Sequence, residues 1–269
     1  MRITGKTRIM FILADAVDHI VGSDVLNQSF EEQDLDIAVS PLSIAPDDLE
    51  QSVATISRFA NVIGFGVTIP HKIAIIRHLD GLTDAARAIG AVNFVRRDAD
   101  GRLVGHNIDG EGFVAGLASH GVQVEGARIL QIGAGGVGRA IAYSLAQAGA
   151  ASIALVNRST EKAKDLAATI RAKMPDAVIS VHACEADLSD EAFDLIVNAT
   201  SLGMHADDPM PASLHHVRAG ATVAEVIMKP AITPLLKEAD RSGARVIPGL
   251  AMMQPQPALV ARFLGLAAV

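Results

Sequence analysis

A glycine-rich turn in the middle of the chain constrains the fold more than any other feature. The mostly apolar stretch 127–132 leads into Gly133, Gly135 and Gly138, and an amphipathic stretch follows over residues 139–148. In a strand–turn–helix unit, the first glycine permits the sharp turn, the second lets a pyrophosphate approach the backbone, and the third lets helix and strand pack closely. The N–H groups at the helix N-terminus attract the anion. The pattern predicts a dinucleotide-binding unit, with a substrate domain before it.

The residues after the next apolar run indicate which dinucleotide is bound. The run 152–156 ends in Asn157 and Arg158, with Lys162 one helical turn further along. An acidic residue about 20 residues past the glycines binds the ribose 2′-hydroxyl of NAD, whereas a guanidinium matches a 2′-phosphate. We therefore expect NADP as the preferred cofactor and NAD as the alternative. A solvated arginine at a strand end is the other interpretation of Arg158.

Composition and length exclude several classes of protein. The chain of 269 residues is long enough for one large domain or two modest ones. Its net charge of -7, with no tryptophan and one tyrosine, argues against nucleic-acid binding. Cys184 is the one cysteine, which excludes an internal disulfide, and no Cys/His cluster has metal-ligand spacing. We expect no metal and no nucleic-acid partner.

Neither end of the chain has the pattern of a membrane segment. The apolar run 9–14 is short and is followed by Asp15, so it is interpreted as a first buried strand, not a signal peptide. The apolar stretch after Pro257 carries Arg262 and is too short to span a bilayer. The expectation is a cytoplasmic protein, a monomer or homodimer, without a membrane partner.

Apolar runs alternate with helical patterns along the chain, which predicts an α/β architecture with parallel strands. The expected strands are 9–13, 35–39, 62–67, 92–95, 103–105, 129–132, 153–156, 195–198, 222–226 and 245–247. The expected helices are 24–32, 46–59, 70–78, 139–148, 257–266 and one that follows Thr233 and Pro234. We expect two domains with a cleft between them. Residues 1–108 form an αβ substrate-binding lobe completed by the C-terminal segment 249–269, and residues 109–248 form a Rossmann-type nucleotide-binding domain.

Polar side chains lie at the ends of several predicted strands. Lys72 falls in the first turn of a predicted helix, where a cation opposes the helix dipole, and this mismatch hints at a function. Asn93 offers an amide that both donates and accepts, and Asp109 is a carboxylate between glycines at the domain boundary. A polar turn at 198–204 follows a strand of the nucleotide domain, where doubly wound sheets bind ligands.

At these residues the chain resembles the shikimate/quinate dehydrogenase family. The resemblance covers nearly the whole chain and rests on the segments 67–72, 89–93, 105–109, 133–139, 157–159, 198–204 and 249–256. It implies two α/β domains around a cleft. It also implies hydride transfer between a nicotinamide cofactor and the secondary alcohol or ketone of a cyclic hydroxy acid, such as shikimate, quinate or a related ring compound.

The resemblance also implies roles for particular residues. Lys72 and Asp109 correspond to the catalytic pair, and the chemistry agrees, because a lysine and a carboxylate that share a hydroxyl can orient it and accept its proton. A surface salt bridge is the other interpretation of that pair. Thr68, Asn93 and Gln256 match family contacts to the substrate. The cofactor contacts correspond to Gly133, Ala134, Gly135, Gly136, Val137, Asn157, Arg158, Thr200, Ser201, Val226, Gly249 and Met252.

The chain departs from the family where shikimate is held. Two serines that hold the substrate carboxylate in the family are Ile20 and Gly22 here, within the segment 19–23. Four further polar positions of the family, an asparagine, two threonines and a tyrosine, are Gly66, Phe94, Ile108 and Met228. A buried carboxylate without partners binds poorly. The departures predict a more apolar pocket and a hydroxylated ring substrate other than shikimate, or shikimate used only poorly.

Two other functions fit parts of the sequence. One is a non-catalytic nucleotide-binding sensor on the same fold, which the loss of the carboxylate site suits but the retained Lys72 and Asp109 do not. The other is an enzyme similar to methylene-tetrahydrofolate dehydrogenase, against which the positions of Asp109 and Asn93 argue.

Overall fold

The computed structural model describes residues 2–18, 20–188, 192–205 and 207–266, and it divides into two compact units. The first unit comprises Met1–Ile108 and Pro257–Val269, and the second comprises Asp109–Gln256. Among the described residues, none of the helices has the length and apolarity needed to cross a membrane.

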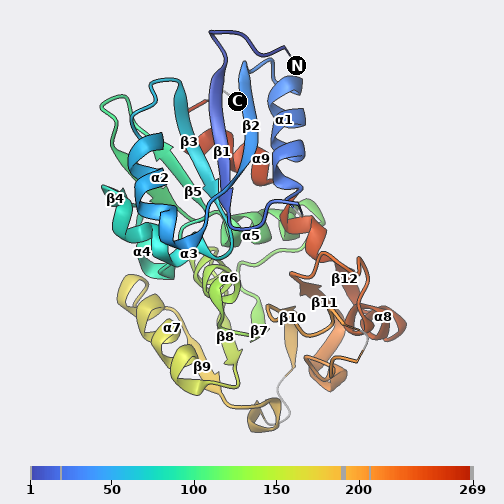
Figure 1. The fold of residues 1–269 in the computed structure, drawn as a ribbon. Coiled ribbons are helices and arrows are strands. Elements are labelled where there is room, and N and C mark those ends of the chain that lie inside the picture. Colours follow the sequence, from blue (N-terminus) through green and yellow to red (C-terminus); the bar gives the residue numbers. More distant parts are fainter. Residues whose placement is uncertain (1, 19, 189–191, 206, 267–269) are drawn as a thin grey trace. The chain divides into compact units, whose positions relative to one another are not determined.

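The first unit contains a six-stranded sheet in the order β2-β1-β3-β5-β6-β4 (Figure 1). Its strands are β1 (Arg8–Ala14), β2 (Ile37–Ser43), β3 (Val62–Val67), β4 (Gly81–Leu82), β5 (Phe94–Arg97) and β6 (Leu103–His106). Strand β1 pairs in parallel with β2 and β3, but β5 runs antiparallel to both β3 and β6. The expectation of parallel strands is therefore wrong for β5. A tight turn at Asp98–Gly101 joins β5 to β6, and so short a connection permits only antiparallel pairing.

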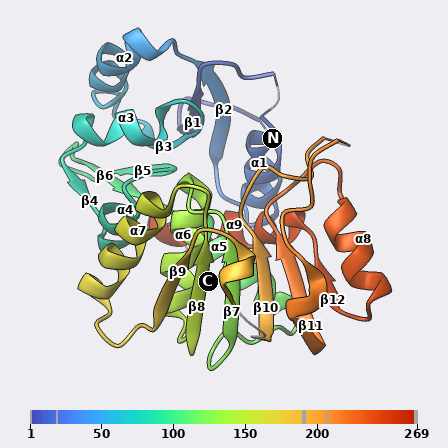
Figure 2. The ribbon, with the colours of Figure 1, turned by 90° about the horizontal axis from the view of Figure 1, so that it is seen from below.

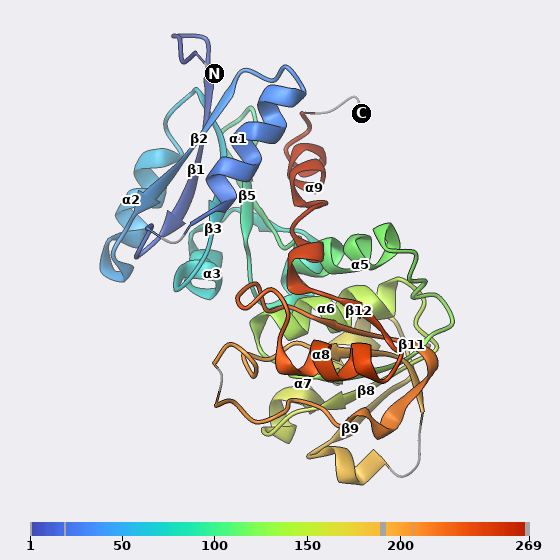
Figure 3. The same ribbon diagram turned by 90° about the vertical axis from the view of Figure 1, so that its right-hand side faces the viewer.

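Helices cover both faces of this sheet. They are α1 (Gly22–Glu32), η1 (Pro46–Asp48), α2 (Leu49–Ile56), α3 (His71–Ala74), η2 (Ile75–His78), α4 (Asp84–Ile89) and α9 (Gln256–Phe263). Helices α1 and α9 pack on the face that carries Ile12 and Phe94, whereas α2 packs on the face that carries Phe65 and Val95 (Figures 1 and 3). The predicted helices 46–59 and 70–78 are each divided between a 3₁₀ turn and an α-helix.

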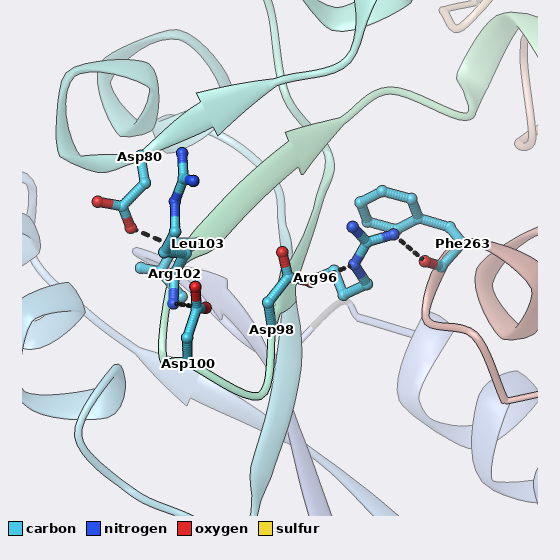
Figure 4. Close-up of polar contacts among 7 residues, drawn as sticks. All are labelled: Asp80, Arg96, Asp98, Asp100, Arg102, Leu103 and Phe263. Carbon is cyan, nitrogen blue, oxygen red and sulfur yellow. Dashed lines mark hydrogen bonds and ion pairs between the residues drawn. The ribbon is translucent and has the colours of Figure 1, made fainter.

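One arginine of β5 binds the C-terminal helix to the sheet of the first unit (Figure 4). Arg96 Nη1 donates to the carbonyl oxygen of Phe263 at 3.1 Å, and its guanidinium lies 5.3 Å from the centroid of the Phe263 ring. Arg96 Nε pairs with Asp98 at 2.7 Å. Segments 167 residues apart in the sequence therefore belong to one folded unit.

The second unit is a doubly wound sheet in the order β12-β11-β10-β7-β8-β9, with every pair parallel (Figure 2). Its strands are β7 (Arg128–Ile132), β8 (Ser152–Val156), β9 (Ile179–His182), β10 (Phe193–Asn198), β11 (Val217–Glu225) and β12 (Arg245–Ile247). Its helices are α5 (Asp109–Ser119), α6 (Gly136–Gln147), α7 (Thr160–Lys173), η3 (Glu185–Leu188), η4 (Leu214–His216), α8 (Pro234–Arg241) and η5 (Gly249–Met252). The strand order reverses between β7 and β10, and such a switch point is where open α/β sheets bind ligands.

Candidate active site

The glycine-rich turn closes at the carboxyl end of β7. Gly133 has a φ of 105°, and a Cβ there would lie 2.7 Å from the carbonyl oxygen of Ala199. A Cβ on Gly138 would lie 2.4 Å from the carbonyl oxygen of Gly133. Only glycine fits these two positions. In contrast, a Cβ on Gly135 or Gly136 would meet nothing within 4 Å, so the backbone there faces open space that a pyrophosphate can approach.

The start of α6 and the end of β8 lie beside the glycine turn, at the carboxyl edge of the parallel sheet. Gly135 is the N-cap of α6 and supplies no side-chain cap to the first-turn N–H groups. Ala134 N donates to Asn157 Oδ1 at 3.0 Å, and Asn157 Nδ2 donates to the carbonyl oxygen of Ser159 at 2.8 Å. Asn157 therefore ties the glycine turn to β8, and the exposed Arg158 follows it. These residues fit a dinucleotide with a 2′-phosphate.

A buried glutamine that the sequence analysis passed over fixes both sides of the turn. Gln131 Nε2 donates to the carbonyl oxygens of Gly133 and Gly138, each at 2.8 Å, and the residue is fully buried. In the sequence, Gln131 stands within the mostly apolar stretch 127–132. A polar amide inside an otherwise apolar strand was the available signal, because a buried amide needs partners.

The polar turn after β10 lies at the same edge of the sheet, since β10 is the neighbour of β7. Asn198 Oδ1 accepts from Thr200 N at 3.1 Å and from Thr200 Oγ1 at 2.7 Å, and Asn198 Nδ2 donates to the carbonyl oxygen of Leu202 at 3.0 Å. Val226 N donates to the carbonyl oxygen of Asn198 at 3.2 Å. The structure thus brings Thr200, Ser201 and Val226 to the edge that carries the glycine turn.

Strand β11 ends at this edge in a buried carboxyl group. Glu225 is 1% exposed, and its Oε2 accepts from Thr233 Oγ1 at 2.9 Å. Burial raises the pKa of Glu225 to about 7, and the side chains of Thr233 and Asn198 offset part of that rise. The sequence analysis did not single out Glu225, which has no motif spacing around it.

In the first unit, three predicted site residues meet where β1 and β3 end. Thr68 N donates to the carbonyl oxygen of Leu13 at 3.0 Å, and Val92 N donates to that of Lys72 at 2.8 Å. Asn93 Oδ1 accepts from Ile108 N at 2.9 Å. Asn93 is buried, whereas Thr68 and Lys72 are half-buried. We call Thr68, Lys72 and Asn93 the polar cluster.

The short helix α3 positions Lys72. His71 is buried, and its Nε2 lies 2.9 Å from the carbonyl oxygen of Ile44, while its backbone N donates to the carbonyl oxygen of Thr68 at 2.8 Å. Lys72 lies in the first turn of the helical stretch that α3 and η2 form together, so the expected opposition between its cation and the helix dipole stays a prediction.

In the second unit, Asp109 begins helix α5, and Gln256, the first residue of α9, packs against α5 at Gly112. Asp109 is buried and begins the helix, and Gly112 and Gly116 follow it at helical spacing. A Cβ on Gly112 would lie 2.8 Å from the carbonyl oxygen of Met252 and 3.4 Å from Gln256 Cγ. A Cβ on Gly116 would lie 2.5 Å from the carbonyl oxygen of Ala251. Glycines therefore let Met252 and Gln256 pack against the face that Asp109 begins.

A doubly wound nucleotide-binding unit, joined to a unit with a lysine–amide cluster, defines a nicotinamide-dependent oxidoreductase. Family models support this. The substrate-binding domain of shikimate dehydrogenase matches residues 12–95, and the shikimate/quinate 5-dehydrogenase model matches residues 116–205. The chain belongs to the shikimate dehydrogenase family. The family, the α/β fold and the enzyme class predicted from the sequence are confirmed.

Relatives and solved structures agree with this assignment. Shikimate dehydrogenase (NADP(+)) of Geobacter metallireducens is 39% identical over 95% of this chain and 90% of its own, and that of Bacillus subtilis is 35% identical over 92% and 88%. Shikimate 5-dehydrogenase from Listeria monocytogenes, in complex with shikimate and NAD, is 29% identical with a TM-score of 0.91, over 98% of this chain and 94% of its own. The 5-ketofructose reductase of Gluconobacter sp. strain CHM43 is 31% identical with a TM-score of 0.87, over 97% and 94%.

Proposed function

We propose that the protein transfers hydride between NADP and the secondary alcohol or ketone of a cyclic hydroxy compound of the kind that its relatives use. The observation that carries this proposal is the retention of four residues. In one unit the carbonyl oxygen of Lys72 accepts from Val92 N, next to Asn93, and in the other Asp109 begins the helix α5 against which Gln256 packs at Gly112. Relatives with these segments are named for shikimate, and one structural relative is named for 5-ketofructose, a ketone without a carboxylate.

The nucleotide edge of the second unit supports NADP as the preferred cofactor, with NAD as the alternative. The backbone of residues 133–137 and the start of α6 would hold the pyrophosphate, and Asn157 and Arg158 would hold the ribose and its 2′-phosphate. The residues proposed for the nicotinamide half are Thr200, Ser201, Val226, Gly249 and Met252. When bound, the cofactor accepts or supplies the hydride.

The side chains proposed for the substrate move and orient one proton. Lys72 and Asp109 share the reacting hydroxyl and accept its proton as the alcohol becomes a ketone. Asn93, whose Oδ1 accepts from Ile108 N, is the amide proposed to contact the substrate. Thr68 and Gln256 orient the ring. His71 acts as a positioning residue, since it fixes the start of α3.

We also propose the biological setting. Residues 1–108 with the C-terminal segment form the substrate-binding domain, and residues 109–248 form the nucleotide-binding domain. The single cysteine, Cys184, is exposed and excludes an internal disulfide, which suits the reducing cytoplasm. The proposed assembly is a monomer or a homodimer, and the partner is a small-molecule substrate.

Initial rates with NADP and NAD against a panel of cyclic hydroxy compounds test the proposed function. We expect nicotinamide reduction with at least one ring alcohol, faster with NADP than with NAD. Tight binding of NADP without turnover of any ring compound would favour the nucleotide-binding sensor instead. Turnover of a folate derivative alone would favour the methylene-tetrahydrofolate dehydrogenase alternative.

A further inference from the structure

Three buried polar side chains lie together at the carboxyl edge of the second unit's sheet. Asn198 ends β10 and Glu225 ends β11, and the two residues are paired in register across these parallel strands. Thr233, which precedes α8, is the third, and each of the three is at most 1% exposed. The proposed proton transfer uses none of them. Because a buried carboxyl group is costly to maintain, its place in this network indicates a role.

The hydroxyl group of Thr233 links Glu225 to the start of α8. Thr233 Oγ1 accepts from Leu236 N at 3.3 Å, as the N-cap of α8, and donates to Glu225 Oε2 at 2.9 Å. A hydroxyl group has one proton and offers it to one acceptor at a time. Removal of the Glu225 carboxyl group therefore leaves a buried donor unsatisfied, which is unfavourable.

Thr233 also packs against the far end of the polar turn 198–204. A Cβ on Gly203 would lie 3.4 Å from Thr233 Cβ and from Thr233 Cγ2, and Gly203 has a φ of 106°. The near end of the turn is Asn198, whose Oδ1 accepts from Thr200 N and Thr200 Oγ1. Glu225 therefore supports the turn at both ends: it lies beside Asn198 in the sheet, and it reaches Gly203 through Thr233.

The chain that follows Glu225 contacts the remaining segment of this edge. Val226 N donates to the carbonyl oxygen of Asn198 at 3.2 Å. A Cβ on Gly249 would lie 2.4 Å from the carbonyl oxygen of Ile227, so η5 begins against the backbone next to Val226. Three segments meet around Glu225, and they carry all the residues proposed for the nicotinamide half: Thr200, Ser201, Val226, Gly249 and Met252.

We infer that Glu225, as a neutral carboxyl group, is a positioning residue for the nicotinamide half of the cofactor: it holds the turn 198–204, the start of α8 and Val226 in one arrangement. Because it is 1% exposed, it acts through its neighbours and not by touching the nicotinamide ring. The inference rests on the proposed function, since that proposal places the nicotinamide at these segments.

The neutral form fits the contacts of the two carboxyl oxygens. Oε2 accepts from Thr233, whereas Oε1 is buried and has no hydrogen-bond partner within the described part of the chain. An ionised carboxylate shares its charge between both oxygens and would leave Oε1 without a donor, but a protonated carboxyl group carries no charge. Burial likewise raises the pKa of Glu225 to about 7. Ionisation above that pH would draw water to Oε1 and loosen the turn.

The protonation of Glu225 follows from burial and not from a charged neighbour. After burial, the causes that act on its pKa are the neutral side chains of Thr233 and Asn198. On the adjoining strand and turn, the carboxylates of Asp194 and Asp208 accept from the backbone N–H groups of Arg128 and Gly203. The other charged residues of the adjoining loop, of α8 and of β12 are exposed: Lys229, Lys237, Glu238, Asp240, Arg241 and Arg245.

Two ligands that differ in the nicotinamide test the inference. Calorimetry at pH 6 gives the dissociation constants of NADP and of 2′-phospho-ADP-ribose, a fragment that keeps the pyrophosphate and the 2′-phosphate. We expect Glu225→Ala to weaken NADP by ~10-fold, about the loss of one buried hydrogen bond, and to leave the fragment within ~2-fold. Glu225→Gln keeps an oxygen acceptor without charge and should match wild type, as should the control Glu238→Gln on α8.

The pH dependence separates positioning by a neutral group from a purely structural role. Both ligands carry the 2′-phosphate, so its titration cancels in the ratio of their affinities. From pH 6 to pH 8 the wild-type affinity for NADP relative to the fragment should fall by ~5-fold as Glu225 ionises, and the ratio for Glu225→Gln should stay constant. A constant wild-type ratio, or the same fall in Glu225→Gln, would overturn the inference.

The remaining outcomes separate this inference from the proposed function. Equal losses of both ligands in Glu225→Ala would overturn the inference alone, because Glu225 would then only stabilise the fold. If Glu225→Ala does not fold, Thr233→Val removes the donor to Oε2 and should show the same selective loss of NADP. No binding of NADP by wild type would overturn both proposals. A selective loss of NADP in a protein that oxidises no ring compound would reject the proposed reaction alone.

Discussion

The glycine turn of the second unit and the sheet edge of the first unit use opposite kinds of side chain. At the turn, Gln131, Asn157 and Asn198 hold the backbone through amide hydrogen bonds of 2.7–3.1 Å. At the edge of the first unit, backbone hydrogen bonds place Thr68 and Lys72, and the sheet packs through apolar residues such as Ile12 and Phe94. The turn is held by side-chain amides, whereas the edge of the first unit is held largely by backbone contacts and apolar packing.

The residues around the cofactor and the residues around the substrate can therefore diverge separately. A dinucleotide is the same for many enzymes, so the backbone geometry around Gly133 and Gly138 allows little change. In the first unit, Gly66 and Phe94 fit each other across β3 and β5, so these two positions can change together without moving Lys72 or Asn93 from the strand ends.

The largest expected effect follows from removing the proposed proton acceptors. Lys72→Ala and Asp109→Asn should each lower kcat by ~10²–10⁴-fold, because a positioned acid–base group contributes that much. The dissociation constant for NADP should stay close to wild type, since neither residue belongs to the glycine turn. Steady-state rates and a nucleotide titration measure the two quantities.

Controls for that prediction are Lys237→Ala and Asp240→Asn, which change exposed residues of α8. Near-normal kcat in both Lys72→Ala and Asp109→Asn would contradict the proposal that these two residues accept the proton. A loss of NADP affinity equal to the loss of turnover would place these residues at the nucleotide.

The next effect concerns Glu225 at the nucleotide edge. Its pKa is about 7 in the folded chain against 4.5 ordinarily, so between these values the folded state holds one proton more than the unfolded state. The free energy of unfolding should therefore fall by about 1.4 kcal/mol per pH unit from pH 5 to 7, about 3 kcal/mol in all. Below that window both states are protonated, and above it the loss is complete.

Glu225→Gln should remove this slope, because the amide does not titrate. Urea unfolding across the pH range gives the free energies, and Glu238→Gln on the exposed face of α8 is the control. If wild type and Glu225→Gln have parallel pH profiles, the buried carboxyl group does not titrate as described.

Gly66 of β3 and Phe94 of β5 lie opposite each other, and we predict that substitutions at these two positions have non-additive effects on stability. Gly66→Asn alone should lower the free energy of unfolding by ~1–3 kcal/mol, because its Cβ meets the Phe94 ring at 3.3 Å. Combined with Phe94→Thr, the same substitution should cost less than the sum of the two single changes. Denaturant unfolding of the four proteins in the cycle measures the coupling, and simple additivity would show that the two positions do not compete for space.

The smallest effect is on cofactor choice. Arg158→Ala should weaken NADP by ~10-fold and leave NAD nearly unchanged, since the guanidinium would pair only with the 2′-phosphate. Fluorescence titration with both nucleotides measures this, with the exposed Arg171→Ala on α7 as the control. Equal losses for NADP and NAD, or tighter binding of NAD by wild type, would count against the preference.

Continuous apolar runs made most strands of the second unit predictable from the sequence. The strands around the glycine turn are uninterrupted apolar runs, and β7, β8, β10 and β12 lie where they were expected. Helix α5 was not predicted, because Gly110, Gly112 and Gly116 lower helix propensity. Close packing explains these glycines, since a Cβ on Gly110 would lie 2.1 Å from the carbonyl oxygen of Ala140.

The sequence predicted the site residues that belong to motifs. It did not predict the residues that support them through hydrogen bonds. Lys72, Asn93 and Asp109 stand in recognisable segments, whereas Gln131 and Glu225 act through pairings across strands that no local spacing shows. Apolar alternation does not encode the direction of β5, but the short turn between Asp98 and Gly101 does, because it permits only antiparallel pairing with β6. The convergence of Gly66 and Phe94 depends on that antiparallel register. His19, the first residue of the divergent N-terminal segment, lies outside the described residues.

A crystal structure of the protein with NADP and a slowly reacting cyclic hydroxy acid tests the account most directly. We predict the ring hydroxyl within ~2.6–3.2 Å of Lys72 Nζ and of the Asp109 carboxylate. A ring hydroxyl held by other residues would contradict the account.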